Sequence, residues 1–265
     1  MSLLLVASLG MFVGLLMGLT GAGGGIVAVP LLMVFLPVTF ANAVPVAMLA
    51  TAMAAGVGTI LGLRSGLVRY RAAGLMAAVG ILIAPFGIWL SHRLDPMILT
   101  VLFAGVLLLV ACRTICNRNP ELPHAADETL PCLVDRNTGR LIWNSRCSSS
   151  LMLSGGLAGL LSGMIGVGGG FVIVPALQRL SVLSMHSVLH TSLAVIFLVS
   201  TSVVIGYAGL GAIDWQLAIP FSMTAVFGLA LGRRFVSRWS PRVLRLAFAV
   251  LAVGVAVMLL VRAFA

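Results

Sequence analysis

Two clusters of glycine are the part of this sequence best suited to bind a ligand. Both stand inside long apolar stretches and share the pattern Gly-x-Gly-Gly-Gly. Glycine adopts positive φ and leaves backbone N–H groups uncovered, and a helix that starts after the turn adds the positive end of its dipole. Successive free N–H groups of this kind bind anions. We predict that eight glycines contact an anionic solute: Gly21, Gly23, Gly24, Gly25, Gly166, Gly168, Gly169 and Gly170.

A structural role is the alternative for these glycines, because glycine also permits a tight turn and close contact between helices. Irregular backbone at membrane depth is tolerated only where it is buried in protein or lines an aqueous cavity. A nucleotide-binding loop is a poor interpretation, since no Lys-Ser or Lys-Thr follows either cluster.

A second polar group stands at the start of an apolar segment in the second half of the chain. His190, Thr191 and Ser192 fall within about the first turn of this segment. An imidazole and two hydroxyls at that place could bind an oxyanion or pass a proton, so we predict that they contribute to substrate binding. Hydrogen bonding between helices is the alternative. In the first half, Thr51 and Thr59 are the nearest polar residues, and we rank them lower.

The apolar stretches offer no constellation for catalysis. No Asp or Glu falls deep within them, which argues against a carboxylate proton relay or a carboxylate sodium site. Paired carboxylates, a cluster of metal ligands and an activated nucleophile are also missing from these stretches. We therefore predict no catalytic residue, no metal site, no cofactor and no enzymatic activity.

Four cysteines lie in or beside a central polar segment: Cys112, Cys116, Cys132 and Cys147. Their spacing lacks the paired two-residue gaps that are usual in four-thiolate zinc sites. We therefore expect reduced thiols at a membrane surface rather than a metal or redox site.

The elements that must position these residues are arranged as a duplication. Each glycine cluster lies at the same place in one of two units, which are 145 residues apart in the sequence without a gap. The paired positions include Gly14 and Gly159, Gly66 and Gly211, Gly87 and Gly232, Pro96 and Pro241, and Phe103 and Phe248. Glycine or proline breaks at corresponding places of two apolar halves are typical of transporter binding sites.

Composition makes the chain a membrane protein. Of its 265 residues 61% are apolar and only 8% are charged, with a mean hydropathy of +1.19. Apolar runs long enough to cross a hydrocarbon core of about 30 Å recur along both halves. The first run, 2–20, has no basic segment or cleavage pattern, so we predict a permanent helix rather than a signal peptide. The predicted fold class is an all-α polytopic membrane protein.

The arginines predict how the two units are oriented. Lys and Arg gather in cytoplasmic loops, and the loop that carries them differs between the units. In the first unit the arginine-rich loop lies between the apolar runs 43–63 and 72–91 and contains Arg64, Arg69 and Arg71. In the second unit it follows the apolar run 215–232, which corresponds to 72–91, and contains Arg233, Arg234, Arg238, Arg242 and Arg245. The units are therefore predicted to be inverted repeats, each a glycine-tipped helical hairpin followed by three transmembrane helices. Because these arginines lie in short loops between apolar spans, we exclude a nucleic-acid partner for the formal charge of +10.

This orientation predicts three parts of the chain. They are a first transmembrane repeat (1–112), a cytoplasmic linker with a short hairpin (113–147) and a second transmembrane repeat (148–265). Both glycine tips are expected to approach each other within the membrane, whether the hairpins are re-entrant or fully spanning. Both termini are predicted to lie outside a cell (inner) membrane.

The doubled phrase Gly-x-x-Gly-x-Gly-Gly-Gly, with Pro30 or Pro175 five residues on, resembles the sulfite exporter TauE/SafE family. The stretch that begins Thr191-Ser192-Leu193-Ala194 and the linker pattern that ends at Trp143 are also similar to that family. The resemblance implies an inner-membrane transporter of small anionic or organic compounds, often sulfur-containing ones such as sulfite or sulfonates.

We therefore predict a secondary transporter or exporter of a small anion, which works by alternating access between the two units. A passive anion channel lined by opposed half-helices is the alternative. The expected partners are the small anionic solute and the lipid bilayer, and a homo-oligomer is left open.

Overall fold

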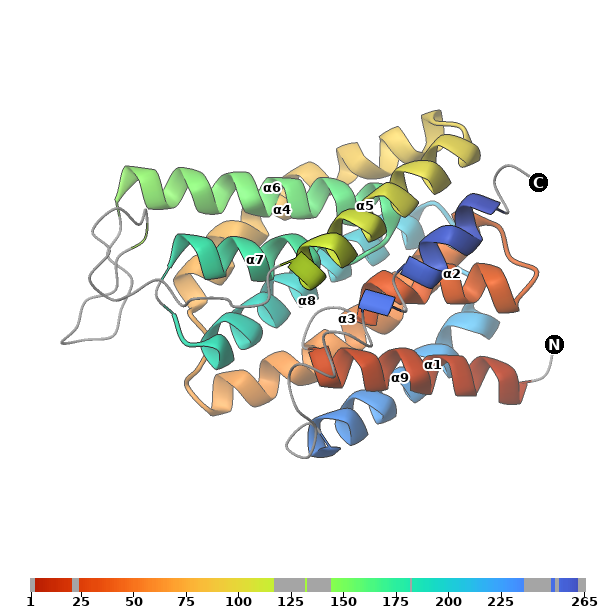
Figure 1. Ribbon diagram of the computed structural model, residues 1–265, viewed down its shortest axis with the longest axis horizontal. Helices are drawn as coiled ribbons and strands as arrows, with labels where there is room; N and C mark the ends of the chain where they lie inside the picture. Colours follow the sequence, from red (N-terminus) through yellow and green to blue (C-terminus); the bar gives the residue numbers. More distant parts are fainter. Residues whose placement is uncertain are drawn as a thin grey trace.

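The computed structural model describes residues 3–20, 24–116, 132, 144–181, 183–235, 249–250 and 253–261, and helices joined by short turns make up nearly all of them (Figure 1). This confirms the prediction of an all-α chain. The helices are α1 (Leu3–Thr20), α2 (Gly24–Phe35), α3 (Phe40–Arg64), α4 (Tyr70–Arg93), α5 (Pro96–Cys116), α6 (Ser145–Ile165), α7 (Gly170–Leu180), α8 (Met185–Gly209) and α9 (Trp215–Phe235). A further helical stretch covers 253–261.

Within the described residues, five helices are long and apolar enough to cross a membrane: α3, α4, α6, α8 and α9. The polytopic membrane architecture is therefore confirmed. Helices α2 and α7 have only 12 and 11 residues, or about 18 and 17 Å at the rise of an α-helix. Neither can cross a core of about 30 Å, so the second arm of each glycine hairpin is a half-helix.

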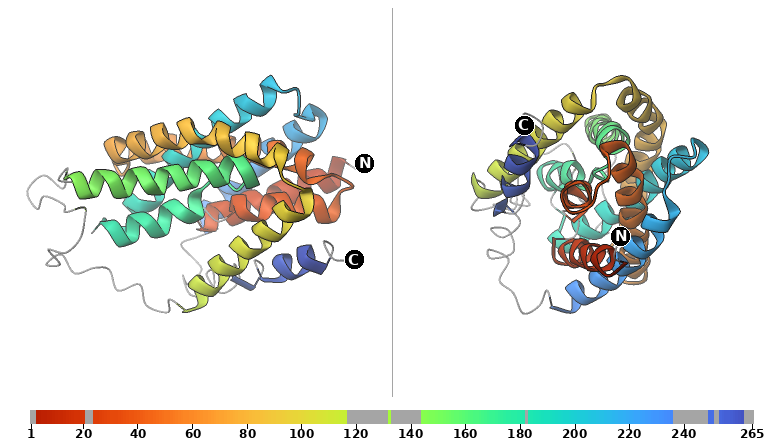
Figure 2. Two further views of the ribbon diagram at one scale, coloured as in Figure 1. Left: turned by 90° about the horizontal axis from the view of Figure 1, so that it is seen from above. Right: turned by 90° about the vertical axis from the view of Figure 1, so that its right-hand side faces the viewer.

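The two hairpins enter the bundle from opposite ends (Figure 1). Helix α1 starts at the end where α4 finishes, which we call the distal end. Helix α6 starts at the other end, which carries the α3–α4 turn and Cys132 and which we call the linker end (Figures 1 and 2). This is the arrangement expected of two units inserted in opposite directions.

Each unit packs its glycine-rich helix against the other unit. In α6, a β-carbon on Gly155 or Gly159 would collide with the backbone of Met76 or Gly80 in α4. In α1, one on Gly14 would collide with Ala225 in α9, the position 145 residues after Gly80. Backbones approach this closely only where small residues line the interface.

The turns that follow α3 and α8 occupy equivalent places in the two units and have the same backbone conformation. Gly66 and Gly211 both adopt φ of +66°, a conformation that glycine takes without strain. Between these turns and the glycine tips, α3 and α8 pack against each other through the centre of the bundle. The central pair therefore holds both hairpins in place.

The cysteines correct one prediction. Cys132 and Cys147 form a disulfide, so the expectation of reduced thiols is wrong for this pair. Both side chains are buried, and the N–H of Cys132 donates a hydrogen bond to the Leu180 carbonyl at the end of α7 (3.0 Å). Cys132 lies between the end of α7 and the start of α6, which brings the two sulfurs together and which spacing alone does not reveal. The short hairpin predicted around Asn137–Gly139 lies outside the described residues.

Candidate functional site

The two glycine tips meet inside the bundle. A β-carbon on Gly25, in the first turn of α2, would lie 3.0 Å from the carbonyl oxygen of Val167 in the second tip. The same β-carbon would lie 3.1 Å from Oγ1 of Thr51 in α3. The duplicated turns are thus direct neighbours, with one hydroxyl beside both. Gly21 and Gly23 lie outside the described residues, and Gly24 starts α2.

The second tip is a tight turn that only glycine can form without strain. Gly166, Gly168 and Gly169 have φ of +77°, +74° and +68°, and α7 starts at Gly170. The first intrahelical bonds of α7 run from the N–H groups of Val172 and Ile173 to the Gly169 carbonyl (3.0 and 3.2 Å). The N–H groups at the very start of a helix have no intrahelical acceptor, so those of Gly170 and the next residue are left for another one.

Two buried hydroxyls face this tip. A β-carbon on Gly168 would lie 2.8 Å from Cγ2 of Thr51 and 3.4 Å from Oγ of Ser200 in α8. Thr51 is 3% exposed and Ser200 0% exposed, and neither hydroxyl has a hydrogen-bond partner among the described residues. A buried hydroxyl without a partner costs about 1–3 kcal/mol. This pair is therefore suited to bind something other than the protein.

The site lies near the middle of the membrane-spanning helices. Thr51 follows the first residue of α3 by 11 positions and precedes the last by 13, which places it roughly 17 and 20 Å from the two ends. One face of α3 runs along the second hairpin here. Val44 packs against Gly166, Met48 accepts a hydrogen bond from Ser162 Oγ at its sulfur (3.5 Å), and Thr51 reaches Gly168.

His190, Thr191 and Ser192 lie elsewhere. They stand about one turn into α8, whereas the α8 residues beside the second tip, Ile196 and Ser200, follow Ser192 by four and eight positions, or about 6 and 12 Å along the helix. Thr191 Oγ1 accepts from the N–H of Arg69 (3.0 Å), and Ser192 Oγ donates to the Leu189 carbonyl (2.8 Å). The structure therefore joins Thr191 to the α3–α4 turn and does not bring this triplet to the glycine tips.

His190 is half-buried and packs between α8 and α3 on the linker side of the site. Its Nδ1 lies 2.8 Å from the His186 carbonyl. Its ring packs on Gly62 of α3, whose β-carbon would lie 2.5 Å from His190 Cδ2. The substrate-binding role predicted for His190, Thr191 and Ser192 stays a prediction. A solute bound by these residues would have to move along α8 to reach the glycine tips.

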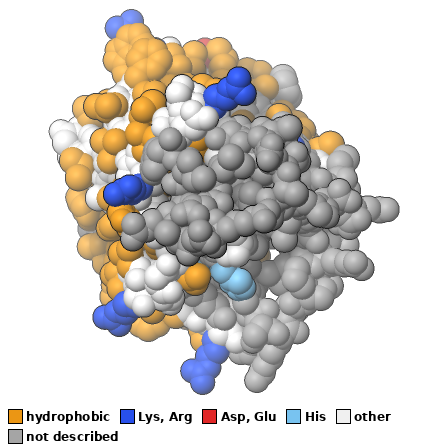
Figure 3. Space-filling model, turned by 90° about the vertical axis from the view of Figure 1, so that its left-hand side faces the viewer, with side chains coloured by type: hydrophobic (Ala, Val, Ile, Leu, Met, Phe, Trp, Pro, Cys, Tyr) orange, Lys and Arg blue, Asp and Glu red, His pale blue; other side chains and the backbone are white. Residues whose placement is uncertain are grey.

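Charge is distributed unevenly between the two ends. Arginine side chains stand around the rim of the linker end (Figure 3), which carries Arg64, Arg69, Arg71, Arg146, Arg179 and Arg234. The distal end carries Arg93 together with Asp95 and Asp214. The atoms nearest to β-carbons on Gly25 and Gly168 belong to uncharged groups, so hydroxyls and backbone dipoles dominate the contact between the tips.

Of the two hydroxyls beside the second tip, sequence reasoning ranked Thr51 below the His190 triplet and did not single out Ser200. Thr51 has no polar counterpart in the other unit, since Ile196 occupies the equivalent position. Ser200 is one of several hydroxyls in α8, and others such as Thr201 bond to their own helix (Thr201 Oγ1 to the Phe197 carbonyl, 2.7 Å). Only the contacts with Gly168 separate Ser200 from them.

Comparison with known proteins agrees with a transporter architecture. Residues 6–259 match the family described as Sulfite exporter TauE/SafE. A relative in Xylella fastidiosa (strain 9a5c), called "Probable membrane transporter protein", is 28% identical over 100% of this chain and 97% of its own length. The "Probable membrane transporter protein YunE" of Bacillus subtilis (strain 168) is 26% identical over 88% of each chain.

A third relative carries the family name itself. It is the "Sulfite exporter TauE/SafE family protein 6" of Arabidopsis thaliana, which is 36% identical over 37% of this chain and 23% of its own length. No solved structure matches the chain. With a match that spans nearly all of its length, the chain belongs to the sulfite exporter TauE/SafE family and is a membrane transporter.

Proposed function

We propose that this protein is a secondary transporter of a small anion, and that the anion binds where the two glycine tips meet. The observation that carries the proposal is the contact of Gly25, Gly168, Thr51 and Ser200 near mid-membrane, with both hydroxyls unpartnered. A sulfur-containing anion, such as sulfite or an organosulfonate, is the substrate class that the family name favours.

Two helix dipoles would stabilise a negative solute at this place. Helices α2 and α7 both start at the tips and run toward opposite ends of the bundle (Figure 2). Each helix N-terminus acts as roughly half a positive charge, and its effect is strongest within the first turn. The N–H groups of Gly24, Gly25 and Gly170 and the hydroxyls of Thr51 and Ser200 would supply hydrogen-bond donors.

The inverted arrangement supplies a mechanism for alternating access. In inverted repeats, the route from the site to the outside and the route to the inside are lined by corresponding helices of the two units. Rocking one unit against the other then opens the site to each side of the membrane in turn. Here Val44 covers Gly166 from the distal end, and His190 covers Gly62 from the linker end. Movement at either contact would open one route.

A passive anion channel is the second candidate, since opposed half-helices also occur in pores. The close packing of Val44 on Gly166 and of His190 on Gly62 supports a transporter over an open pore. The charged rim of the linker end suits either reading, since it concentrates anions near the membrane.

Flux through purified protein in proteoliposomes tests the proposal. We expect uptake of radiolabelled sulfite or a small organosulfonate that saturates with concentration and runs uphill when a proton gradient is imposed. Flux that stays proportional to concentration and only dissipates gradients would support the channel. If sulfite, sulfate and organosulfonates all fail to move, the anion proposal is wrong.

A further inference from the structure

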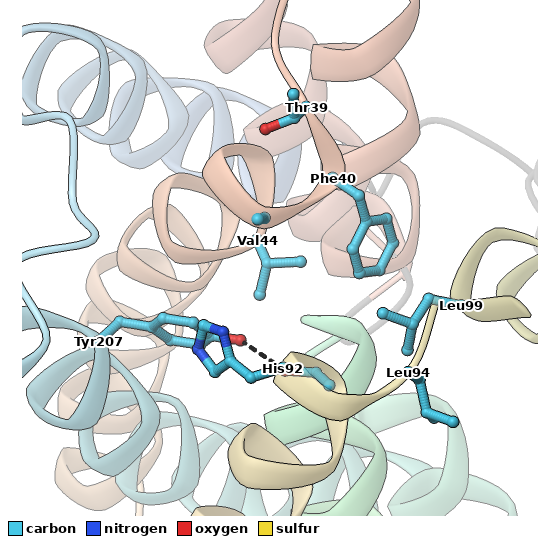
Figure 4. A pocket seen from close by; sticks show the side chains of 9 residues that line it. Thr39, Phe40, Val44, His92, Leu94, Leu99 and Tyr207 are labelled. Atoms are coloured by element: carbon cyan, nitrogen blue, oxygen red, sulfur yellow. Dashed lines mark hydrogen bonds between the residues drawn. The ribbon is translucent and has the colours of Figure 1, made fainter. Parts of the chain in front are cut away.

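A separate cavity of about 180 Å³ opens at the distal end, between the start of α3 and the ends of α4 and α8 (Figure 4). It is much smaller than the 300–1,000 Å³ of pockets for drug-sized ligands, so it suits a small solute. Thr39 and His92 stand at its exposed mouth, while Val44 and Tyr207 are buried within it.

The wall of the cavity has a polar side and an apolar side. Figure 4 shows Tyr207 and His92 on one side, and Phe40, Leu94 and Leu99 around the other. The lining residues include no carboxylate, and neither Asp95 nor Asp214, the acidic residues described at this end, belongs to them. A solute here would meet hydrogen-bond donors on one side and hydrocarbon on the other.

The Tyr207 hydroxyl is only weakly engaged by the protein. It lies 3.3 Å from the Gly163 carbonyl and 3.5 Å from Ser91 Oγ, both longer than the 2.5–3.0 Å typical of a hydroxyl hydrogen bond. The Ser91 hydroxyl donates to the Ile88 carbonyl (2.8 Å), so Tyr207 is the donor in its contact with Ser91 as well as with Gly163. A solute in the cavity would compete with two long hydrogen bonds for the Tyr207 proton.

The floor of the cavity is the boundary of the central site. Val44 packs directly on Gly166 of the second tip, and seven residues farther along the same face of α3 stands Thr51, about 10 Å deeper. Pro45 has no N–H to donate to the Ala41 carbonyl, so the first turn of α3 lacks one of its hydrogen bonds. This loosens the segment that separates the cavity from the tips.

We propose that this cavity is an access site that binds a small organic monoanion with a short alkyl chain, such as an alkanesulfonate. The proposal rests on the transport function proposed above and narrows its substrate class. The anionic group lies at Tyr207 and His92, and the alkyl chain lies against Phe40, Leu94 and Leu99. A fully inorganic anion such as sulfite gains nothing from the apolar side and loses hydration there.

Calorimetric titration of the purified full-length protein with methane-, ethane-, propane- and butanesulfonate tests this site. Each added methylene should raise affinity about fourfold until the cavity is full, as expected for about 0.8 kcal/mol per buried methylene. Tyr207→Phe should weaken all members of the series by about tenfold, since each loses the same hydrogen bond. Leu99→Ala should instead move the optimum to a longer chain, because it enlarges the apolar side.

Matched controls exist for both variants. Tyr70→Phe changes the one other tyrosine of the chain, which lies exposed at the linker end, and Leu102→Ala changes a leucine on the outside of α5. Both should bind like the wild type. Affinity that is independent of chain length, or a Tyr207→Phe protein that binds like Tyr70→Phe, would overturn the proposal. Absence of transport in proteoliposomes with a normal chain-length series would instead refute the transport function alone.

Discussion

At the scale of single residues, the site depends on two hydroxyls that their own helices do not use. Thr59, two turns beyond Thr51 in α3, donates to the Ala55 carbonyl (2.7 Å), as threonines in helices commonly do. Thr51 and Ser200 make no such bond among the described residues, although both are buried. The protein thus keeps an unfavourable feature where a solute would use it, as functional sites often do.

A methyl group on Gly25 would crowd the contact between the two tips. Gly25 has none of the positive φ found in the second tip, so alanine fits its backbone, but the methyl would lie 3.0 Å from the Val167 carbonyl oxygen. We expect Gly25→Ala to lower transport by about tenfold or more, because small misplacements at a site are costly. Gly74→Ala, a helical position in α4 with nothing within 4 Å, is the control. Equal transport rates of the two variants in proteoliposomes would disprove this steric role.

The glycine turn of the second tip was predictable from sequence, and the hydroxyls beside it were not. Eight clustered glycines at equivalent places in two apolar units point to a turn that exposes backbone N–H groups. A hydroxyl in a long apolar helix gives no comparable signal, because whether it is satisfied depends on its neighbours in space. The hydrogen bond from the Arg69 N–H to Thr191 was equally hidden, because the sequence does not show which turn lies against the start of α8.

At the scale of elements, the glycine stripes determine which helices can touch. A β-carbon on Gly159 would collide with the backbone of Gly80, so alanine cannot be accommodated by a side-chain shift. We expect Gly159→Ala to separate α6 from α4 and to lower the unfolding temperature in detergent markedly. Gly105→Ala in α5, where a β-carbon meets nothing within 4 Å, should be neutral or stabilising by up to about 1 kcal/mol. Similar unfolding temperatures for the two variants would show that the close approach is dispensable.

The presence of a glycine-tipped hairpin in each unit was predictable, but how far each hairpin extends into the membrane was not. Sequence placed a glycine tip in each unit and left open whether both arms cross the membrane. The structure resolves this through length, since α2 and α7 end after 12 and 11 residues. Pro30 and Pro175 stand inside these half-helices without ending them. The exchange of partners between units, α1 with α9 and α6 with α4, was also beyond sequence reasoning, because helices that are apolar all round do not reveal which face meets which neighbour.

At the scale of the whole molecule, the arginines and the disulfide of the linker end favour opposite sides of the membrane. Its arginines predict that this end faces the cytoplasm, where disulfides are rare and usually transient or redox-sensing. The Cys132–Cys147 bond lies at this end. Under the predicted orientation it belongs to that labile class. Labelling of a single cysteine introduced at Ser65 with a membrane-impermeant reagent reads the orientation directly, and the side on which each terminus lies stays a prediction until then.

The central claim concerns the Thr51 hydroxyl, and Thr51→Val tests it against Thr59→Val in the same helix. Valine keeps the approximate shape of threonine and removes only the hydroxyl, so each variant deletes one buried donor. A hydrogen bond to a charged group contributes about 1.5–3 kcal/mol, which corresponds to a loss of roughly 10- to 100-fold in apparent anion affinity.

The measurement is concentration-dependent anion uptake into proteoliposomes, paired with thermal unfolding of each variant. The account predicts that Thr51→Val loses affinity by this factor while unfolding at or above the wild-type temperature, and that Thr59→Val transports normally. Uptake by Thr51→Val that matches Thr59→Val at every concentration would contradict the claim that an anion binds between the two glycine tips.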